Sequence, residues 1–399
     1  MNEELIKKKL EQHIRALRAP AGYIRAGYPN FPGLFGRDSL IVAWELLAHD
    51  PRIAQKTLVK LATLQGKRVN HKSEEEPGKI LHEYYEPWQM WVRFVQKSLV
   101  TFGWGQPYFG SVDATFLWII VLERYYAQTH DDALLRRLWS HLLRALSWIK
   151  EYADSDGDGF FDYRAHNPIA LQHQAWKDSD EFGAITQPIA PVEVQGYAYA
   201  ALQAAARLTG NRAHTWCVWA QERSRTLQKN FRNAYIMSDY FAYALDGNGA
   251  QLPWVTSNPS HLLFAGLISK ADEEMIISKV FSADLWTKYG MRTLAVSEPS
   301  FAWQSYHRGS VWPHDNWFFW LGLRETKRFR EAKKVKEAMC AAFSALNGII
   351  PELYAVDPQT QEISPDIYVG TSSVKHRIGN PQAWASGALL AMLNDDRSS

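Results

Sequence analysis

Two separate segments carry carboxyl groups in settings that favour acid/base chemistry, and the first is residues 172–181. They read QHQAWKDSDE, so Asp178 follows Trp176 closely and precedes further carboxyls. An apolar indole and neighbouring negative charges both raise the pKa of a carboxyl, which then stays protonated as a general acid near neutral pH. The Ser, Asp and Glu residues of the run DSDE are also typical of a solvated helix cap. Asp178 is therefore predicted either as a general acid or as part of a cap.

The second segment is residues 348–361, GIIPELYAVDPQTQ, in which Glu352 follows an apolar run. Glycoside hydrolysis needs two carboxyls, one to protonate the leaving oxygen and one to activate water or attack carbon. Glu352 could be the second, or an ordinary structural carboxyl, because only a fold can bring it near Asp178. If the pair is catalytic, we expect a raised pKa for Asp178 and an ionised Glu352.

A dense group of aromatic and polar residues lies between these segments, at 304–323, QSYHRGSVWPHDNWFFWLGL. Hydrogen-bond donors surround a glycine that would let the backbone approach a ligand, as a polyhydroxy ligand requires. Two histidines seven residues apart, without an HExxH pattern, are weak evidence for zinc. The candidate ligand contacts here are Tyr306, His307, Arg308, Gly309 and Trp312.

Three further segments have roles that the residues leave open. In LFGRDSL, Arg37 and Asp38 start a helix, and Asp38 could cap it or accept hydrogen bonds from sugar hydroxyls. Residues 154–159, DSDGDG, resemble the start of a calcium loop. Counted from Asp154, position 12 of such a loop is Ala165 rather than glutamate, which excludes an EF-hand. A tight turn or another kind of calcium site is left. The loop 66–79 is either a mobile flap over a pocket or an ordinary solvated loop.

Helical periodicity dominates the elements that must position these side chains, with little strand signal between them. One all-helical domain spanning 1–399 is expected, because no low-complexity linker or repeat divides the chain. Helices of unequal length joined by long loops favour a closed toroid over a solenoid. The expected helices are 2–18, 38–49, 52–65, 85–101, 112–128, 132–152, 190–208, 211–230, 259–268, 271–281, 314–325, 329–346 and 381–393.

The composition excludes several classes of protein. The formal net charge is +2, so the chain lacks the one-signed field of a nucleic-acid binder. No run approaches the ~20 apolar residues of a membrane span, and the charged N-terminus has no export signal. Two cysteines, Cys217 and Cys340, fit a reducing cytoplasm. The 17 tryptophans suit either an aromatic core or a site that stacks on sugar rings, so a small carbohydrate is the expected partner. Oligomeric state is not predicted.

Ten strings in chain order together resemble the helical-toroid glycoside hydrolases, closest to the bacterial amylo-α-1,6-glucosidase (glycogen-debranching-type) group. They are also similar to glycoside hydrolase family sixty-three, which includes mannosylglycerate and glucosylglycerate hydrolases. The strings are LFGRDSL, EEEPGKILHE, YFGSVDATFLW, DSDGDGFFDY, QAWKDSDE, PIAPVEVQGYAYAAL, VTSNPSHLLFAGL, SYHRGSVWPHDN, PELYAVDPQTQ and PQAWASGALL.

This resemblance implies an all-α fold, an (α/α)6 barrel of six helical hairpins with long loops around a funnel-shaped pocket at one end. It implies hydrolysis with inversion, with Asp178 as general acid and Glu352 as general base. The sugar contacts that it implies are Arg37, Asp38, Asp113, Trp176 and the segment YHRGSVW. Such a reaction uses water and two carboxyls, so neither a metal nor an organic cofactor is expected.

The resemblance leaves the substrate open. A short α-glucoside or the non-reducing end of an α-glucan is the first hypothesis, and a short substrate is favoured because larger relatives carry an additional β-rich domain. The second is an α-glycosyl-glycerate, which needs a subsite for a carboxylate. A helical sugar-binding protein without catalysis is a third, from another class. The candidate carboxylate contacts are Arg308, Lys177, His307 and Gln382.

Overall fold

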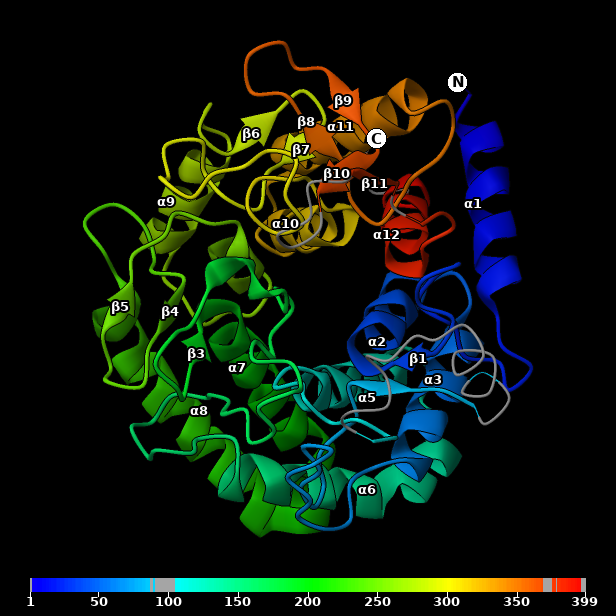
Figure 1. Cartoon of the computed structure of the whole chain (residues 1–399). Helices are drawn as coiled ribbons and strands as arrows, with labels where there is room; N and C mark the ends of the chain where they lie inside the picture. Colours follow the sequence, from blue (N-terminus) through cyan, green and yellow to red (C-terminus); the bar gives the residue numbers. More distant parts are fainter. Residues whose placement is uncertain (1, 87–88, 90–104, 369–374, 378, 396–399) are drawn as a thin grey trace.

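The computed structural model describes residues 2–86, 89, 105–368, 375–377 and 379–395. Within this part of the chain, helices form two concentric rings (Figure 1). The outer helices are amphipathic: α1 (Glu3–Leu17) buries Ile6, Leu10 and Ile14 at helical spacing. The other outer helices are α3 (Pro51–Thr63), α6 (Asp132–Glu151), α8 (His214–Tyr235), α9 (Lys270–Val280) and α11 (Phe329–Ala345).

The inner elements are buried on nearly all sides, as expected for helices that are apolar around their whole circumference. Each packs against the next, and the last packs against the first, so the ring closes within the described residues. They are α2 (Gly36–Glu45), α5 (Ala114–Thr129), α7 (Val192–Thr209), the 3-10 helix η4 (Asn258–Leu262), α10 (Pro313–Glu325) and α12 (Ala383–Leu393).

Each inner element contacts an outer partner, and α12 pairs with α1, which brings the two ends of the chain together (Figure 1). The six pairs form an (α/α)6 barrel, as the sequence predicts. The expected helix at 259–268 is different: the structure has a 3-10 helix and turns there, with Pro259 near the start and Gly266 at φ 75°. The helix expected at 85–101 falls almost entirely outside the described residues.

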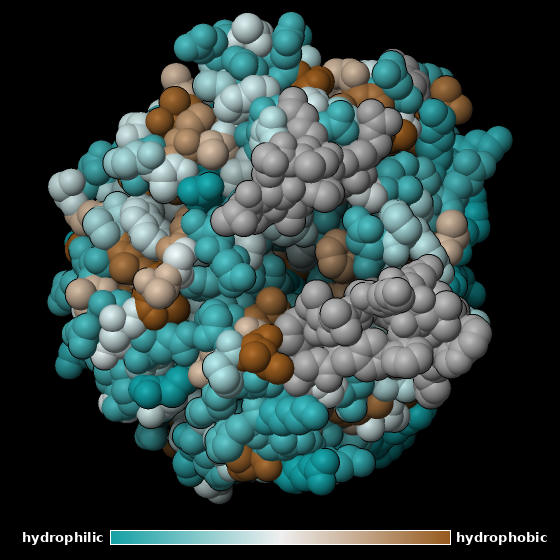
Figure 2. Space-filling view, viewed as in Figure 1, coloured by the Kyte–Doolittle hydropathy of each residue, from teal (hydrophilic) through white to brown (hydrophobic). Residues whose placement is uncertain are grey.

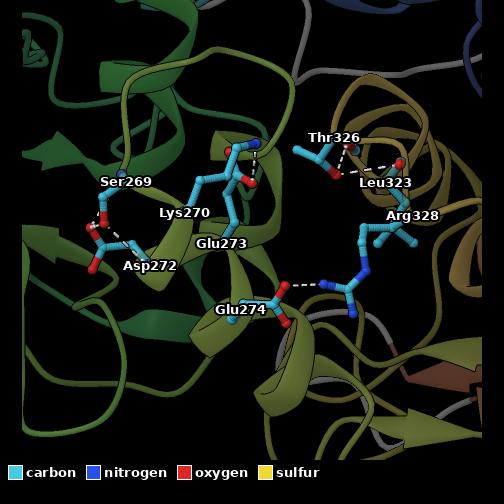
Figure 3. Close-up of polar contacts among 9 residues, drawn as sticks. Ser269, Lys270, Asp272, Glu273, Glu274, Leu323, Thr326 and Arg328 are labelled. Carbon is cyan, nitrogen blue, oxygen red and sulfur yellow. Dashed lines mark hydrogen bonds and ion pairs between the residues drawn. The ribbon is translucent and has the colours of Figure 1, made fainter.

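Side-chain hydrogen bonds cap the N-termini of the outer helices α1, α3, α6 and α9. A capping box starts α9, in which Ser269 accepts from the backbone of Asp272 and the Asp272 carboxylate accepts from Ser269 (Figure 3). In the same view, Arg328 pairs with Glu274 of α9 from the turn between α10 and α11. This pair joins α9 to the segment just before α11.

Short antiparallel strands occupy the connections, and several lie at the end of the barrel that faces the viewer in Figure 1. β1 runs directly into α2, and β3 runs directly into α7. The pairs are β1 (Leu34–Phe35) with β2 (Glu83–Tyr84), β3 (Ala190–Pro191) with β4 (Ala244–Leu245), β4 with β5 (Gln251–Leu252), β6 (Trp286–Thr287) with β7 (Gly290–Met291), β8 (Ala355–Val356) with β9 (Ile363–Ser364) and β10 (Asp366–Tyr368) with β11 (Lys375–Arg377). Among the described helices, none is long and apolar enough to cross a membrane.

Candidate active site

The predicted site residues gather where the inner helices begin. Arg37 and Asp38 lie in the first turn of α2, and Asp113 is the residue before α5. Trp312 precedes α10 in the same way, and Gln382 precedes α12. Helix N-termini carry partial positive charge, so this end of the barrel suits carboxylates and hydroxyl oxygens. Figure 2 views the molecule as in Figure 1 and shows a hollow near the middle of this face.

The buried side chain of Arg37 organises one wall of the site. Its Nε donates to Asp113 Oδ2 at 2.7 Å, and one terminal nitrogen donates to Asp178 Oδ2 at 3.1 Å. The other terminal nitrogen donates to the carbonyl of Ala175 at 2.8 Å. A planar guanidinium can make all these contacts at once, so Arg37 fixes the loop that carries Asp178 against α2 and α5.

Asp178 and Asp38 both have raised pKa values. Burial raises the pKa of Asp178 to about 6, against the opposing effect of the Arg37 charge. Burial likewise raises the pKa of Asp38 to about 7, again opposed by Arg37. Asp178 is not a helix cap: the 3-10 helix η2 (Asp180–Phe182) begins after Ser179 and has no side-chain cap. The expected rise in the pKa of Asp178 is thus present.

Glu352 lies in the loop between α11 and β8, and 5% of its surface is exposed. Its Oε1 accepts from Gln382 Nε2 at 3.1 Å, and the Tyr306 hydroxyl also hydrogen-bonds to its carboxyl. Burial, followed by the negative charge of Asp38, raises the pKa of Glu352 well above its usual range, and the Asp178 charge adds to this. The raised pKa of Glu352 was not expected from the sequence, and it follows from the enclosure of this carboxyl.

Aromatic rings form the wall beneath these carboxyls. Trp176 meets Trp312 and His307 edge to face, with ring centroids 5.6 Å apart in both cases. The rings of His307 and Trp312 stack at 5.0 Å, and Trp312 Nε1 donates to the carbonyl of Tyr306 at 2.9 Å. These contacts make the aromatic wall rigid, and the rings of Trp176, Trp312 and His307 are almost completely buried.

Three other predicted ligand contacts, Lys177, Gly309 and Arg308, form no hydrogen bond or ion pair with the carboxyls of Asp178 and Glu352 in the part of the chain that the structure describes. Lys177 is fully buried, and its Nζ donates to the carbonyl of Thr293 at 2.6 Å beneath the aromatic wall. The backbone N–H of Gly309 donates to Thr293 Oγ1, so it is already occupied. Arg308 is half-buried, and no contact joins it to the two carboxyls among the described residues. Within the described ranges, Arg308 Nε is buried without a hydrogen-bond partner.

Two groups near the site were not predicted as functional. The carboxylate of Glu181, at the end of QAWKDSDE, binds the segment 305–307. The only sequence signal for a role of Glu181 is its position three residues after Asp178. Buried Glu193 starts α7, and burial raises its pKa to about 7. A charged residue inside an otherwise apolar inner helix is the signal that could have singled out Glu193.

Two other segments from the sequence have definite structures. Oxygens of Asp154 and Asp156 in the DSDGDG turn and of Asp162 just after it lie within 4.8 Å of one another, and Arg223 pairs with Asp154. In the loop 66–79, the Glu74 carboxylate accepts two backbone hydrogen bonds at 2.7 Å from residues 166 and 167. Glu74 is buried, so the middle of this loop packs on the barrel rather than standing in solvent.

Comparison with protein families identifies the chain. Residues 98–391 match the family model described as amylo-alpha-1,6-glucosidase. The chain belongs to the amylo-α-1,6-glucosidase family. As a member of this family it is a glycoside hydrolase, which agrees with a barrel end that gathers carboxyls and aromatic rings. A comparison with functionally curated proteins gives no match.

Solved structures share the fold of this amylo-α-1,6-glucosidase family member over nearly its whole length. A GH63 mannosylglycerate hydrolase from Thermus thermophilus, in complex with Tris, superposes with a TM-score of 0.72 at 15% identity and covers 97% of this chain and 99% of its own. The same enzyme in complex with glucose gives 0.71 at 16% identity, with the same coverage. A wild-type glycosidase gives 0.66 at 13% identity, covering 98% and 95%.

Proposed function

We propose that the protein is an inverting α-glycosidase that acts on a short α-glucoside or on the non-reducing end of an α-glucan. Asp178 is the general acid and Glu352 the general base. The observation that carries this proposal is the meeting of two carboxyls, 174 residues apart in the chain, in one enclosed end of the barrel (352 − 178). The charge of Asp178 acts on the pKa of Glu352, as expected for two groups that face one substrate.

The reaction needs one proton donated and one removed. Asp178 gives its proton to the glycosidic oxygen as the bond to the anomeric carbon breaks. Glu352 takes a proton from a water molecule, whose oxygen attacks the anomeric carbon from the opposite face. The product therefore has the opposite anomeric configuration. We expect the two carboxyls to stand ~6.5–9.5 Å apart, which leaves room for this water.

The raised pKa values of both carboxyls fit this cycle if the pair is treated as one titrating unit. Between its two apparent pKa values the pair holds a single proton. The productive form has that proton on Asp178 and the charge on Glu352, where the hydrogen bonds from Gln382 and Tyr306 stabilise a carboxylate. The positive charge of Arg37 stabilises the ionised form of Asp178 after this group has donated its proton.

A sugar ring in the hollow would meet polar groups that are held in place by the buried aromatic wall. Asp38 accepts hydrogen bonds from hydroxyls when ionised, while Trp176 and Trp312 belong to the aromatic wall. The glucose complex of the Thermus thermophilus hydrolase is consistent with a small sugar as ligand. These features support a monosaccharide-sized subsite next to the two carboxyls.

One observation favours a second candidate, hydrolysis of an α-glycosyl-glycerate. A carboxylate-bearing leaving group needs a cation, and in the described part of the chain Arg308 Nε is buried with no hydrogen-bond partner. Of the other predicted contacts for this carboxylate, Lys177 is fully buried beneath the aromatic wall. A structure of the Thermus thermophilus mannosylglycerate hydrolase is described in complex with Tris and D-glycerate. Arg308 is thus the residue whose replacement separates the two candidates.

The experiment is a panel of substrates assayed with the wild-type protein, the Glu352→Gln variant and the Arg308→Gln variant. The panel contains isomaltose, panose, limit dextrin, kojibiose, trehalose, glucosylglycerate and mannosylglycerate. We expect turnover of an α-glucoside by the wild type and by Arg308→Gln, and none by Glu352→Gln. Selective loss of a glycerate substrate in Arg308→Gln would replace the first candidate by the second. Equal activity of all three proteins would contradict the proposal.

A further inference from the structure

The carboxylate of Glu181 joins the loop of Asp178 to the segment 305–307. Its Oε1 accepts from Ser305 Oγ at 2.6 Å and from the backbone N–H of Tyr306 at 3.0 Å. Its Oε2 accepts from the backbone N–H of His307 at 2.6 Å. Consecutive backbone N–H groups that converge on a carboxylate make short, charge-assisted and strongly directional hydrogen bonds. Glu181 therefore fixes the distance between these two segments.

The segment held by Glu181 touches Glu352. The Tyr306 hydroxyl hydrogen-bonds to the Glu352 carboxyl, and the Tyr306 carbonyl accepts from the indole of Trp312. A second link, between Ser179 Oγ and His307 Nδ1 at 2.8 Å, runs parallel to the contacts of Glu181. A continuous path of hydrogen bonds and covalent bonds thus leads from the loop of Asp178 through Glu181 and Tyr306 to Glu352.

We propose that Glu181 is a positioning residue that sets the separation between the carboxyls of Asp178 and Glu352. This inference rests on the proposed function, since it assigns Glu181 a role in the geometry of the two proposed catalytic groups. Both oxygens of the Glu181 carboxylate are engaged by the segment 305–307. A displacement of about 1 Å between reacting groups costs on the order of 100-fold in rate, so the contacts of this carboxylate control the rate without taking part in proton transfer.

The Glu181→Gln variant tests the role because an amide has only one acceptor oxygen. Whichever way it is turned, its NH2 group faces at least one donor of the segment 305–307, so at least one of the three contacts is lost. We expect kcat to fall about 10- to 100-fold with a smaller change in KM. Glu181→Asp keeps two acceptors and the charge, and we expect it to recover part of the loss.

Glu298→Gln is the matched control. Glu298 is also half-buried and accepts from the backbone N–H of Val255 at 2.9 Å, a contact that joins two segments away from the two carboxyls. We expect wild-type kcat from this variant. The pH profile is the second readout: a changed separation alters the charge coupling between Asp178 and Glu352, so the two limbs of the Glu181→Gln profile move relative to each other, and those of Glu298→Gln do not.

The proposal is overturned if Glu181→Gln keeps wild-type kcat and pH profile, or if Glu298→Gln loses as much activity at an equal loss of melting temperature. A crystal structure of Glu181→Gln decides the point without an assay: a changed distance between the carboxyls supports the proposal, and an unchanged distance contradicts it. Failure of the proposed function has a different signature, namely full activity in Asp178→Asn or Glu352→Gln.

Discussion

Replacing the two proposed catalytic carboxyls one at a time should separate the acid from the base. An α-glucosyl fluoride releases fluoride without a proton, whereas a disaccharide needs protonation of its leaving oxygen. A positioned general acid or base contributes about 10²–10⁴ to the rate. We therefore expect Asp178→Asn to lose about 10²–10⁴ in kcat on the disaccharide and to stay within about tenfold of wild type on the fluoride. Glu352→Gln should lose about 10²–10⁴ on both substrates, because both need activated water.

The pH at which this comparison is made follows from the structure. The pKa of Asp178 is raised to about 6, so half of this group is protonated at pH 6 and about a tenth at pH 7 if it titrates alone. Activity on the disaccharide should fall as pH rises above this range, because Asp178 loses its proton. It should also fall at acid pH, where the pair holds two protons. The assay is kcat/KM between pH 4 and 9 for each variant and both substrates.

Two results would refute this reasoning. If Asp178→Asn lost as much on the fluoride as on the disaccharide, Asp178 would have a role other than protonation of the leaving group. If the alkaline limb on the disaccharide persisted in Asp178→Asn, another group would be the acid. Circular dichroism and melting temperature of each variant serve as controls for folding.

Three other changes have expected outcomes. Asp38→Asn should stabilise the fold at pH 8 by up to the order of 4 kcal/mol, because the pKa of the buried carboxyl is raised to about 7 and folding then opposes its ionisation. In thermal melts the stabilisation should shrink toward pH 5. The same stabilisation at every pH would contradict the raised pKa of Asp38. Gly309→Ala should lower the free energy of unfolding by about 1–3 kcal/mol and reduce activity, because φ is 137° and a Cβ would lie 2.5 Å from Phe301. The control Gly249→Ala, with open space around its Cβ, should leave activity intact. Equal losses of activity in the two variants would refute this reasoning. Arg37→Lys should lower kcat about 100-fold, because one ammonium cannot replace the three contacts of the guanidinium. Unchanged steady-state kinetics would show that these three contacts are dispensable.

Most of the helices could be predicted from the sequence because their burial follows helical spacing. The expected bounds 132–152 and 329–346 differ from α6 and α11 by only a residue, since amphipathic outer helices show a clear apolar stripe. The element at 258–262 could not be predicted in this way. Its apolar residues also recur at helical spacing, but Pro259 and Gly266 shorten it to a 3-10 helix. This short element is enough to close the ring, because it contacts both α7 and α10.

The site was predictable in its residue types but not in its contacts. Asp178, Glu352 and Arg37 stand out by their neighbours in the chain, yet only the barrel brings them to one end. The orientation of Lys177 beneath the aromatic wall and the enclosure of Glu352 depend on packing between segments far apart in sequence. For the same reason the raised pKa of Glu352 was not predicted: local sequence contains no measure of how deeply a loop carboxyl is covered.

The stereochemistry of the released sugar tests the central claim most directly. Proton NMR of the purified protein with the α-substrate it turns over fastest, recorded before mutarotation, identifies the first anomer. Inversion by Asp178 and Glu352 predicts that the β-sugar appears first and that the α-sugar grows in only by later equilibration. Initial release of the α-sugar would show retention, which requires a nucleophile ~5 Å from the acid, and would contradict the mechanism proposed for these two carboxyls.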